Sequence, residues 1–515
     1  MGKRLTSGVA MLAIGVGLVV TAAFAGPARN GGTFRLAVVG PGDMMDPQVT
    51  YNTLSWSLEY ATAAKLFNYP DRGGGAGTRL VSEVAQRYRV SKNGRTYTFR
   101  IRKGFRFSDG RPVKAMNFVH AFDRATNPAL QSPGNSFFHN IRSYQAKGNR
   151  LVVKLRHADG SFIWLLAVPF FQATSLKLPV DKVVTGPIPS AGPYWIKSSD
   201  PNTRTVIKRN PFYRGTRPHH LKGITVIYNQ NSETAYQQTL RNRFDEGPIP
   251  PDQLQSVANR FGVNRTRFWA KPSGCSSMIL LNDRNGLSHA NAAMRKAFNW
   301  ALDRRAYNAA PGPYARTVWT QLVFPGMSGV ITKRKLQPFT PGPNLAKARK
   351  LAAGHFRDGK ISVFYRSSGI TGPKQRVVVD RVLRRLGFQE QNIRWVGFPG
   401  TDIYDAIYKR TDWDLALSMG WCQDYPKVAD FAFALPGELL PPKYQKKLKA
   451  IEKLKEPARS RALGRFALEV MKKVAPEAPT SLYNNLYLFS NRVRPKSLLY
   501  QSVLTDWDLA AIRLK

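Results

Sequence analysis

Apolar and polar residues alternate over several short stretches, and each of these stretches predicts a β-strand with one buried face. In the clearest stretch, polar residues separate Tyr97, Phe99 and Ile101. Asn93-Gly94 before it and Asp109-Gly110 after it are typical hairpin turns. We expect further strands at residues 31–40, 151–155, 194–198, 203–209, 224–228, 361–365 and 414–419.

Other stretches repeat with the helical period of about 3.6 residues. The residues 44–56 lead into a helical stretch that is expected to run to about residue 68. A later helix should end at Asn127-Pro128, because its apolar residues recur at near-helical spacing: Val113, Met116, Val119, His120 and Phe122. Five more helical runs lie at 290–302, 345–353, 374–386, 442–455 and 459–474. Helices and strands interleave without internal repeats, which indicates a mixed α/β chain.

Length and charge add two constraints. A chain of 515 residues with 43% apolar content can bury a substantial core and should form two or three domains. Its 78 Lys and Arg residues against 32 Asp and Glu residues give a net charge of +46. A surplus of this size favours polyanions, including nucleic acid, anionic lipid and cell-wall polymers.

The first 25 residues have the pattern of a cleavable export signal. Lys3 and Arg4 form a basic start, residues 9–20 are apolar, and Ala23-Phe24-Ala25 is an A-x-A cleavage site. The apolar run is shorter than the ~18 residues that a membrane span needs. No cysteine follows the cleavage site, so no lipoprotein anchor is expected. We therefore expect a periplasmic or secreted protein that carries +44 after cleavage and does not meet nucleic acid.

Export also affects how the two cysteines are interpreted. Cys275 and Cys422 are the only cysteines in the chain and lie 147 residues apart. In an oxidising compartment two cysteines are more often paired than free. We therefore expect a disulfide between them.

Patterns that would indicate an enzyme are absent or incomplete. Residues 354–361, GHFRDGKI, resemble a phosphate-binding loop, but Ile361 replaces the hydroxyl residue that would hold magnesium. The stretch is instead expected to be a helix-to-strand turn. The sequence has no G-x-S-x-G, H-E-x-x-H or C-x-x-C motif. His219 and His220 are adjacent and would face opposite ways on a strand. We predict no enzyme activity, metal or cofactor.

Several blocks follow one another along the chain: GGTFRLAV with MMDPQ, the hairpin and helix around FSDG, IPSAGPYWI, VIKRNPFYRGTRP, and LNDRNGLSHANAAMRKAFNWALDRRAY. In this order they resemble the family 5 extracytoplasmic solute-binding proteins of ABC transporters. Each block is weak alone, but together they cover more than 400 residues in order. Ser190-Ala191 replace the usual Gly-Thr of the third block. Met116-Asn117 replace the acidic pair that usually opens the helix after FSDG, which removes favourable charge near the start of that helix.

The resemblance implies the two-lobed periplasmic binding protein fold of type II, cluster C, with an extra inserted lobe and a cleft that closes by a hinge motion. After a signal peptide at 1–25, we expect lobe I to combine residues 26–67, 189–273 and 485–515. The inserted lobe would take 68–188, and lobe II 274–484.

The resemblance is closest to the oligopeptide-binding branch, in which a G-W-C-x-D-Y stretch lines the cleft. The matching residues here are Gly420, Trp421, Cys422 and Asp424, and Asp424 would bind the free ammonium group of a peptide. The second wall of the family's cleft maps to Tyr51, Asn52 and Thr53, and an aromatic pocket position maps to Trp395. The same branch pairs two cysteines, at positions that Cys275 and Cys422 match.

One departure from the family pattern concerns the residue that would bind the C-terminal carboxylate of a peptide. Some oligopeptide binders have an Arg for this role three residues before the Trp of the motif, where this chain has Ser418. Lys409 and Arg410 are candidate replacements for that Arg.

The first hypothesis is a monomeric peptide-binding component of an ABC importer, which delivers its ligand to a membrane permease and ATPase. A second hypothesis keeps the transport role but replaces the peptide by an oligosaccharide, opine or metal chelate. A third, which rests only on the net charge, is a basic exported protein that binds polyanions. A hydrolase is the fourth.

Overall fold

The computed structural model describes residues 31–72, 74–282, 291–355, 359–400, 402–427, 440–501 and 506–515. The export signal expected at residues 1–25 lies outside these ranges. None of the helices in the described ranges has the length and apolar character needed to cross a membrane.

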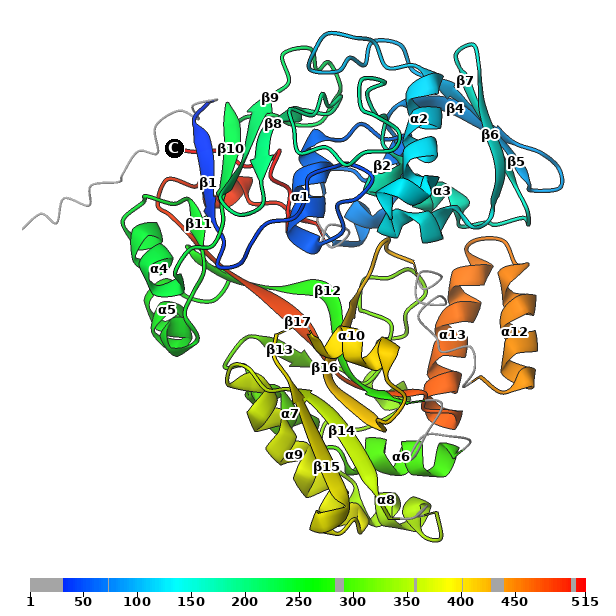
Figure 1. Ribbon diagram of the computed structural model, residues 1–515, viewed down its shortest axis with the longest axis vertical. Coiled ribbons are helices and arrows are strands. Elements are labelled where there is room, and N and C mark those ends of the chain that lie inside the picture. The colour runs from blue at the N-terminus through cyan, green and yellow to red at the C-terminus, as the bar shows by residue number, and fades with distance from the viewer. Residues whose placement is uncertain are drawn as a thin grey trace, which may run out of the picture.

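One large mixed sheet connects the two halves of the molecule (Figure 1). In the described ranges it contains eleven strands. Ten of them follow one another in this order: β15 (Ile393–Phe398), β14 (Ile361–Arg366), β16 (Leu415–Cys422), β12 (Phe268–Leu281), β17 (Glu477–Phe489), β11 (Glu246–Gly247), β1 (Thr33–Ala37), β10 (Gly223–Ile227), β9 (Arg204–Arg209) and β8 (Tyr194–Asp200). The eleventh, β13 (Arg316–Val318), pairs with β17.

Two long strands cross between the halves. β12 has 14 residues and β17 has 13, and they pair in antiparallel register from Phe268 opposite Leu488 to Leu280 opposite Glu477. Figure 1 shows them running diagonally from the upper half, which contains β1 and β8–β10, to the lower half, which contains β14–β16. The mixed α/β architecture predicted from the sequence is therefore confirmed, whereas the expected lobe boundaries stay a prediction.

A separate four-stranded antiparallel sheet lies at the upper right of Figure 1. Its strand order is β4 (Ala85–Val90), β5 (Thr96–Ile101), β7 (Arg150–Leu155) and β6 (Ile141–Lys147). The Asn93-Gly94 turn connects β4 to β5, and Tyr97, Phe99 and Ile101 are buried, as the alternating pattern predicts.

Helix α2 (Ala115–Thr126) packs on this sheet and corrects one detail of the predicted apolar face. Val113 precedes the helix, and Met116 is 46% exposed, because it lies in the first turn on the outer side. The adjacent Asn117 is buried instead. Its side-chain oxygen accepts a hydrogen bond from the Lys114 N–H at 2.8 Å, and its amide donates to the Thr174 carbonyl at 2.9 Å. Asn117 thus satisfies buried polar groups where the family usually has an acidic residue.

The remaining helices lie mostly where the sequence predicts them. The helix expected to reach residue 68 is shorter, since α1 ends at Thr62 and β2 (Phe67–Asn68) pairs with β3 (Val81–Ser82). The turn at 354–361 joins a helix to β14, as predicted; its residues 356–358 lie outside the described ranges. The helices are α1 (Thr53–Thr62), α3 (Phe162–Leu165), α4 (Ser232–Leu240), α5 (Leu254–Phe261), α6 (Ala292–Ala301), α7 (Arg304–Ala309), α8 (Leu345–Ala352), α9 (Thr371–Leu386), α10 (Asp402–Lys409), α12 (Pro442–Glu452) and α13 (Ala458–Lys473).

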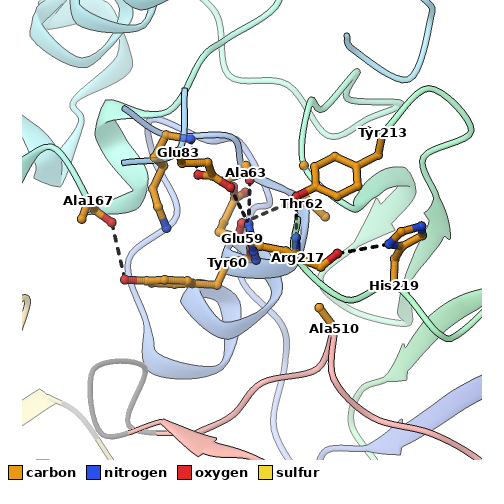
Figure 2. Close-up of polar contacts among 12 residues, drawn as sticks. Glu59, Tyr60, Thr62, Ala63, Glu83, Ala167, Tyr213, Arg217, His219 and Ala510 are labelled. Atoms are coloured by element: carbon orange, nitrogen blue, oxygen red, sulfur yellow. Dashed lines mark hydrogen bonds and ion pairs between the residues drawn. The ribbon is translucent and has the colours of Figure 1, made fainter. Parts of the chain in front are cut away.

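Arg217 binds the C-terminal end of α1 (Figure 2). Its guanidinium donates to the carbonyl oxygens of Tyr60 and Ala63, the latter at 3.1 Å, and pairs with Glu83 at 3.4 Å. Glu83 also accepts a bond from the Lys65 N–H at 2.9 Å. Carbonyls in the last turn of a helix have no partner within the helix. Arg217 therefore satisfies two of these carbonyls and also neutralises the buried carboxylate of Glu83.

Cys275 and Cys422 form a disulfide, which confirms the expected pairing. They lie directly opposite each other where β12 pairs with β16, and β12 pairs with β17 on its other side. The covalent bond therefore fixes the register of β16 against one of the two crossing strands.

We expect that replacing both cysteines by serine lowers the free energy of unfolding by about 2–5 kcal/mol, because the bond closes a long loop in the unfolded chain. Urea unfolding followed by circular dichroism would measure the change. Reductant should destabilise the native protein to a similar extent and leave the double variant unchanged. Equal midpoints for the oxidised protein and the variant would contradict this expectation.

We expect Arg217→Met to destabilise the fold by about 3–5 kcal/mol, since Glu83 would then be buried without its cation. Adding Glu83→Gln should restore part of that loss, because an uncharged amide costs less to bury. Arg214→Met is the matched control: Arg214 is exposed, and its replacement should change stability by less than about 0.5 kcal/mol. Thermal and urea unfolding would rank the variants, and an Arg217 variant as stable as the control would contradict the expectation.

Candidate ligand-binding site

A cavity of about 570 Å³ lies between α1 and the end of β16. Figure 1 shows α1 in the upper half of the molecule and β16 in the lower half. This volume is within the usual range for small-ligand sites. Two separate stretches of the chain supply most of its walls. The lining residues are Tyr51, Asn52, Thr53, Trp56, Tyr60, Tyr404, Gly420, Trp421, Cys422, Gln423 and Asp424.

The first wall begins with a tight turn at Asp46. The Asp46 carbonyl accepts bonds from the N–H groups of Val49 and Thr50 at 3.0 and 2.9 Å. Its carboxylate pairs with the buried guanidinium of Arg124 on α2 and accepts a bond from the Gln48 N–H. The next segment is held by Asp43, whose carboxylate accepts a bond from the Tyr51 N–H at 3.0 Å. Tyr51 is therefore held just before α1 by Asp43, in a segment that follows the turn at Asp46.

Helix α1 forms the rest of the first wall. Asn52 caps it, since its side-chain oxygen accepts a bond from the Ser55 N–H at 2.9 Å. Thr53, Trp56 and Tyr60 follow at the i, i+3, i+7 spacing of one helical face, and all three line the cavity. Trp56 is oriented by a bond from its indole N–H to the Thr50 carbonyl at 2.9 Å.

The second wall is the C-terminal part of β16. Strand β14 pairs with β16 only at Leu415 and Ala416, so the Gly420–Cys422 end extends beyond it along the cavity. A Cβ atom at Gly420 would lie 2.9 Å from the Ser276 carbonyl oxygen, which explains why glycine is required there. The Trp421 ring stacks on Phe324 with centroids 5.5 Å apart.

Asp424 connects the two walls. Its carboxylate accepts a hydrogen bond from the Tyr51 hydroxyl at 3.0 Å, across 373 residues of sequence. Burial raises the pKa of Asp424 to about 7, and the bond from Tyr51 lowers it. A carboxylate held in such a place gains most from a ligand that brings a positive charge.

Seven of the eight ligand-binding residues expected from the resemblance line the cavity: Tyr51, Asn52, Thr53, Gly420, Trp421, Cys422 and Asp424. The eighth, Trp395, is outside the lining. It lies on β15, with its ring 6.0 Å from that of Tyr365 and 5.1 Å from the Arg376 guanidinium.

Sequence reasoning missed four lining residues. Trp56 and Tyr60 could have been found from the helical spacing after Thr53, whereas nothing in the sequence marks Tyr404 or Gln423. In the described ranges, no three His, Cys, Asp or Glu side chains gather as a metal site would require. The His219 ring lies against the Tyr213 ring, 5.6 Å between centroids.

Comparison with known proteins gives partial matches to curated relatives. The chain is 26% identical over 397 residues to the glutathione-binding protein GsiB of Escherichia coli (strain K12), which covers 75% of this chain and 73% of that protein. It is 24% identical over 268 residues to the probable D,D-dipeptide-binding periplasmic protein DdpA of the same strain. That match covers 50% of this chain and 51% of the relative, so it spans about half the length of each.

Solved structures share the fold over nearly the whole chain. The clavulanic acid biosynthesis oligopeptide binding protein 2 has a TM-score of 0.82 at 20% identity, covering 94% of this chain and 96% of that one. The periplasmic binding protein DppA from Helicobacter pylori, in complex with peptide STSA, has a TM-score of 0.74 at 19% identity, covering 94% and 98%. These likenesses confirm the predicted two-lobed periplasmic binding protein architecture.

A family profile decides the assignment. The profile described as bacterial extracellular solute-binding proteins, family 5 Middle, matches residues 79–437, which is more than half of the chain. The protein belongs to the family 5 bacterial extracellular solute-binding proteins.

Proposed function

We propose that the protein is the solute-binding component of an ABC importer that captures short peptides in the cavity between its two halves. Asp424 carries this proposal: a half-buried carboxylate on the wall of a cavity of suitable size, held by Tyr51 from the opposite wall. The names of the relatives, which bind glutathione or a D,D-dipeptide, and of the structural neighbours, which bind peptides, support this ligand class.

The chemistry of the two walls suits a peptide with a free amino group. The Asp424 carboxylate would pair with the ammonium group of the peptide. A neutral side chain could not compensate the positive charge of that group inside the cavity. The exposed end of β16 would offer backbone groups to an extended ligand, so that affinity depends little on the ligand's side chains. Trp421 and Trp56 would provide apolar surface on either side.

The position of the cavity also suits transport. Its walls come from opposite halves, which β12 and β17 connect. A ligand that contacts both walls favours the closed arrangement of the halves, and the closed form would be the one that docks on a membrane permease and its ATPase. We propose that the protein acts as a monomer outside the cytoplasm after removal of residues 1–25. The described cavity residues include one carboxylate and no histidine, a set suited to binding rather than to acid–base chemistry.

We expect Asp424→Asn to weaken binding of free-amine peptides by about ten- to a hundredfold, because the amide cannot neutralise an ammonium group. N-acetylated peptides should bind the variant and the native protein with equal affinity. Isothermal titration calorimetry with a pool of di- to pentapeptides would test this. Asp412→Asn is the matched control, since Asp412 is an exposed carboxylate paired with Arg394 and Arg410. No heat with any peptide pool would refute the proposed function.

We expect peptide affinity to fall as the pH drops below 7. The pKa of Asp424 is about 7, so acid converts the binding carboxylate to its neutral form. The peptide ammonium group, with an ordinary pKa near 8, stays charged in this range. Between pH 7.5 and 5.5 the affinity should therefore decrease roughly twentyfold. Calorimetric titrations at a series of pH values would measure this decrease in affinity. The affinity of the Asp424→Asn variant should change little with pH. The same pH dependence in both proteins would assign the effect to another group.

A further inference from the structure

The four-stranded sheet of β4, β5, β7 and β6 is far more basic than the rest of the chain. Residues 85–101 and 141–155, which contain its strands and both hairpin turns, include nine Lys and Arg residues and no Asp or Glu. The whole chain has 78 basic against 32 acidic residues. The absence of acidic residues from this sheet therefore exceeds the general basic bias of the protein.

The pairing register places the basic side chains of the strands on one face of the sheet. On β5 and β7, buried apolar residues alternate with exposed or half-buried ones, and the buried face packs against α2. The opposite face points outward, at the outer edge of the upper half (Figure 1). We call it the basic face. Its basic residues are all exposed: Arg87, Arg89, Arg100, Lys147, Arg150 and Lys154.

Four of these residues form one row across the sheet. Arg87 lies opposite Arg100, and Arg100 lies opposite Arg150. Lys147 completes the row opposite Arg150. Since neighbouring strands lie about 4.8 Å apart, the row is about 14 Å long. Like charges directly opposite each other destabilise a sheet, so the folding of this sheet does not by itself favour such a row.

The protein does not neutralise the charge of the basic face. Among the residues that the structure describes, none of the six basic side chains forms an ion pair with Asp or Glu. The carboxylates that adjoin the sheet in sequence have other partners, since Glu83 pairs with Arg217 and Asp159 with Arg459. An exposed array of unpaired cations attracts anions over roughly the Debye length, about 8 Å at physiological salt.

The other side chains on the basic face are small or polar. They are Thr96, Thr98, Ser143, Gln145 and Val152. None of these five is aromatic, so they offer no platform on which nucleic acid bases could stack. None is a large apolar side chain that could insert among acyl chains. The basic face therefore suits a broad surface of repeated anions, which it would contact by charge alone.

We propose that the basic face adsorbs the protein to a membrane surface rich in phosphate-bearing lipid headgroups. Each Lys or Arg close to an anionic bilayer adds attraction, and here six of them share one plane. Membership of a family of bacterial extracellular proteins favours a lipid surface over nucleic acid as the partner. This inference goes beyond the proposed function. No cavity-lining residue belongs to this sheet, so adsorption leaves the cavity free to bind its ligand.

Vesicle sedimentation tests the proposal, with the chain from residue 26 onward so that the apolar residues 9–20 cannot insert into lipid. Vesicles of phosphatidylcholine alone are compared with vesicles that also contain about 30% phosphatidylglycerol. We expect binding to the anionic vesicles only. Affinity should be at least about tenfold lower at about 300 mM than at about 50 mM NaCl, because salt screens the attraction.

A variant without the row should lose this binding. Arg87→Gln/Arg100→Gln/Lys147→Gln/Arg150→Gln should bind anionic vesicles about a hundredfold more weakly than the native protein. Its melting temperature should not fall, because the substitutions remove repulsion and break no ion pair among the described residues. The matched control, of equal net charge, removes four exposed cations from α8 and α9 and should keep its affinity within about threefold. It is Lys350→Gln/Lys374→Gln/Arg381→Gln/Arg385→Gln.

Three results would overturn the proposal. The first is no binding of the native protein to anionic vesicles at low salt. The second is an equal loss of binding in the row variant and the control, which would assign the attraction to overall charge. The third is tighter binding to duplex oligonucleotide or polyglutamate than to vesicles at the same concentration of negative charge. If the row variant fails to fold, Arg100→Gln/Arg150→Gln, with an expected loss of about tenfold, takes its place.

Discussion

The pairing of β12 with two partners at once is the constraint on which the rest of the structure depends. On one side β12 pairs with β17, and together they join the two halves. On the other side it pairs with β16, and the disulfide between Cys275 and Cys422 fixes that register. A slip of one residue would turn Gly420 and Trp421 to the wrong faces of the sheet. The position of the cavity wall is therefore set by the same strands that connect the halves.

The opposite wall depends on buried charges. Arg124 neutralises Asp46 behind the turn that leads to Tyr51, and Arg217 holds the end of α1 through Tyr60 and Ala63. Such pairs contribute little net stability, but loss of one partner leaves an unpaired charge in the interior. Their effect is to hold each wall in one conformation, so that Tyr51 reaches Asp424 across the cavity.

The sequence predicted many of the elements that have a clear period, and it was less accurate where polar residues are buried. Helix α1 is an example: a helical stretch was predicted there, but its end at Thr62 was not, and Ser57, Glu59 and Thr62 are all buried in it. Ser57 bonds to Asp506 and Glu59 to Gln172, both far away in the chain. The residues of the two crossing strands were not predicted, for another reason: Pro272 and Gly274 interrupt the strand pattern in β12, and Pro479 interrupts it in β17. Shifts in register at these positions allow the strands to continue.

The sequence by itself determined the α/β class, most of the elements, the cysteine pair and residues on both walls of the cavity. These follow from local period, from local motifs such as G-W-C-x-D-Y, and from collinear blocks. Only the tertiary structure decided which residues meet across the cavity. Tyr404 lies on α10 and carries no local signal, since its place on the cavity wall depends on how α10 packs against β14. The contact of Tyr51 with Asp424 likewise depends on the way the crossing strands place the two halves.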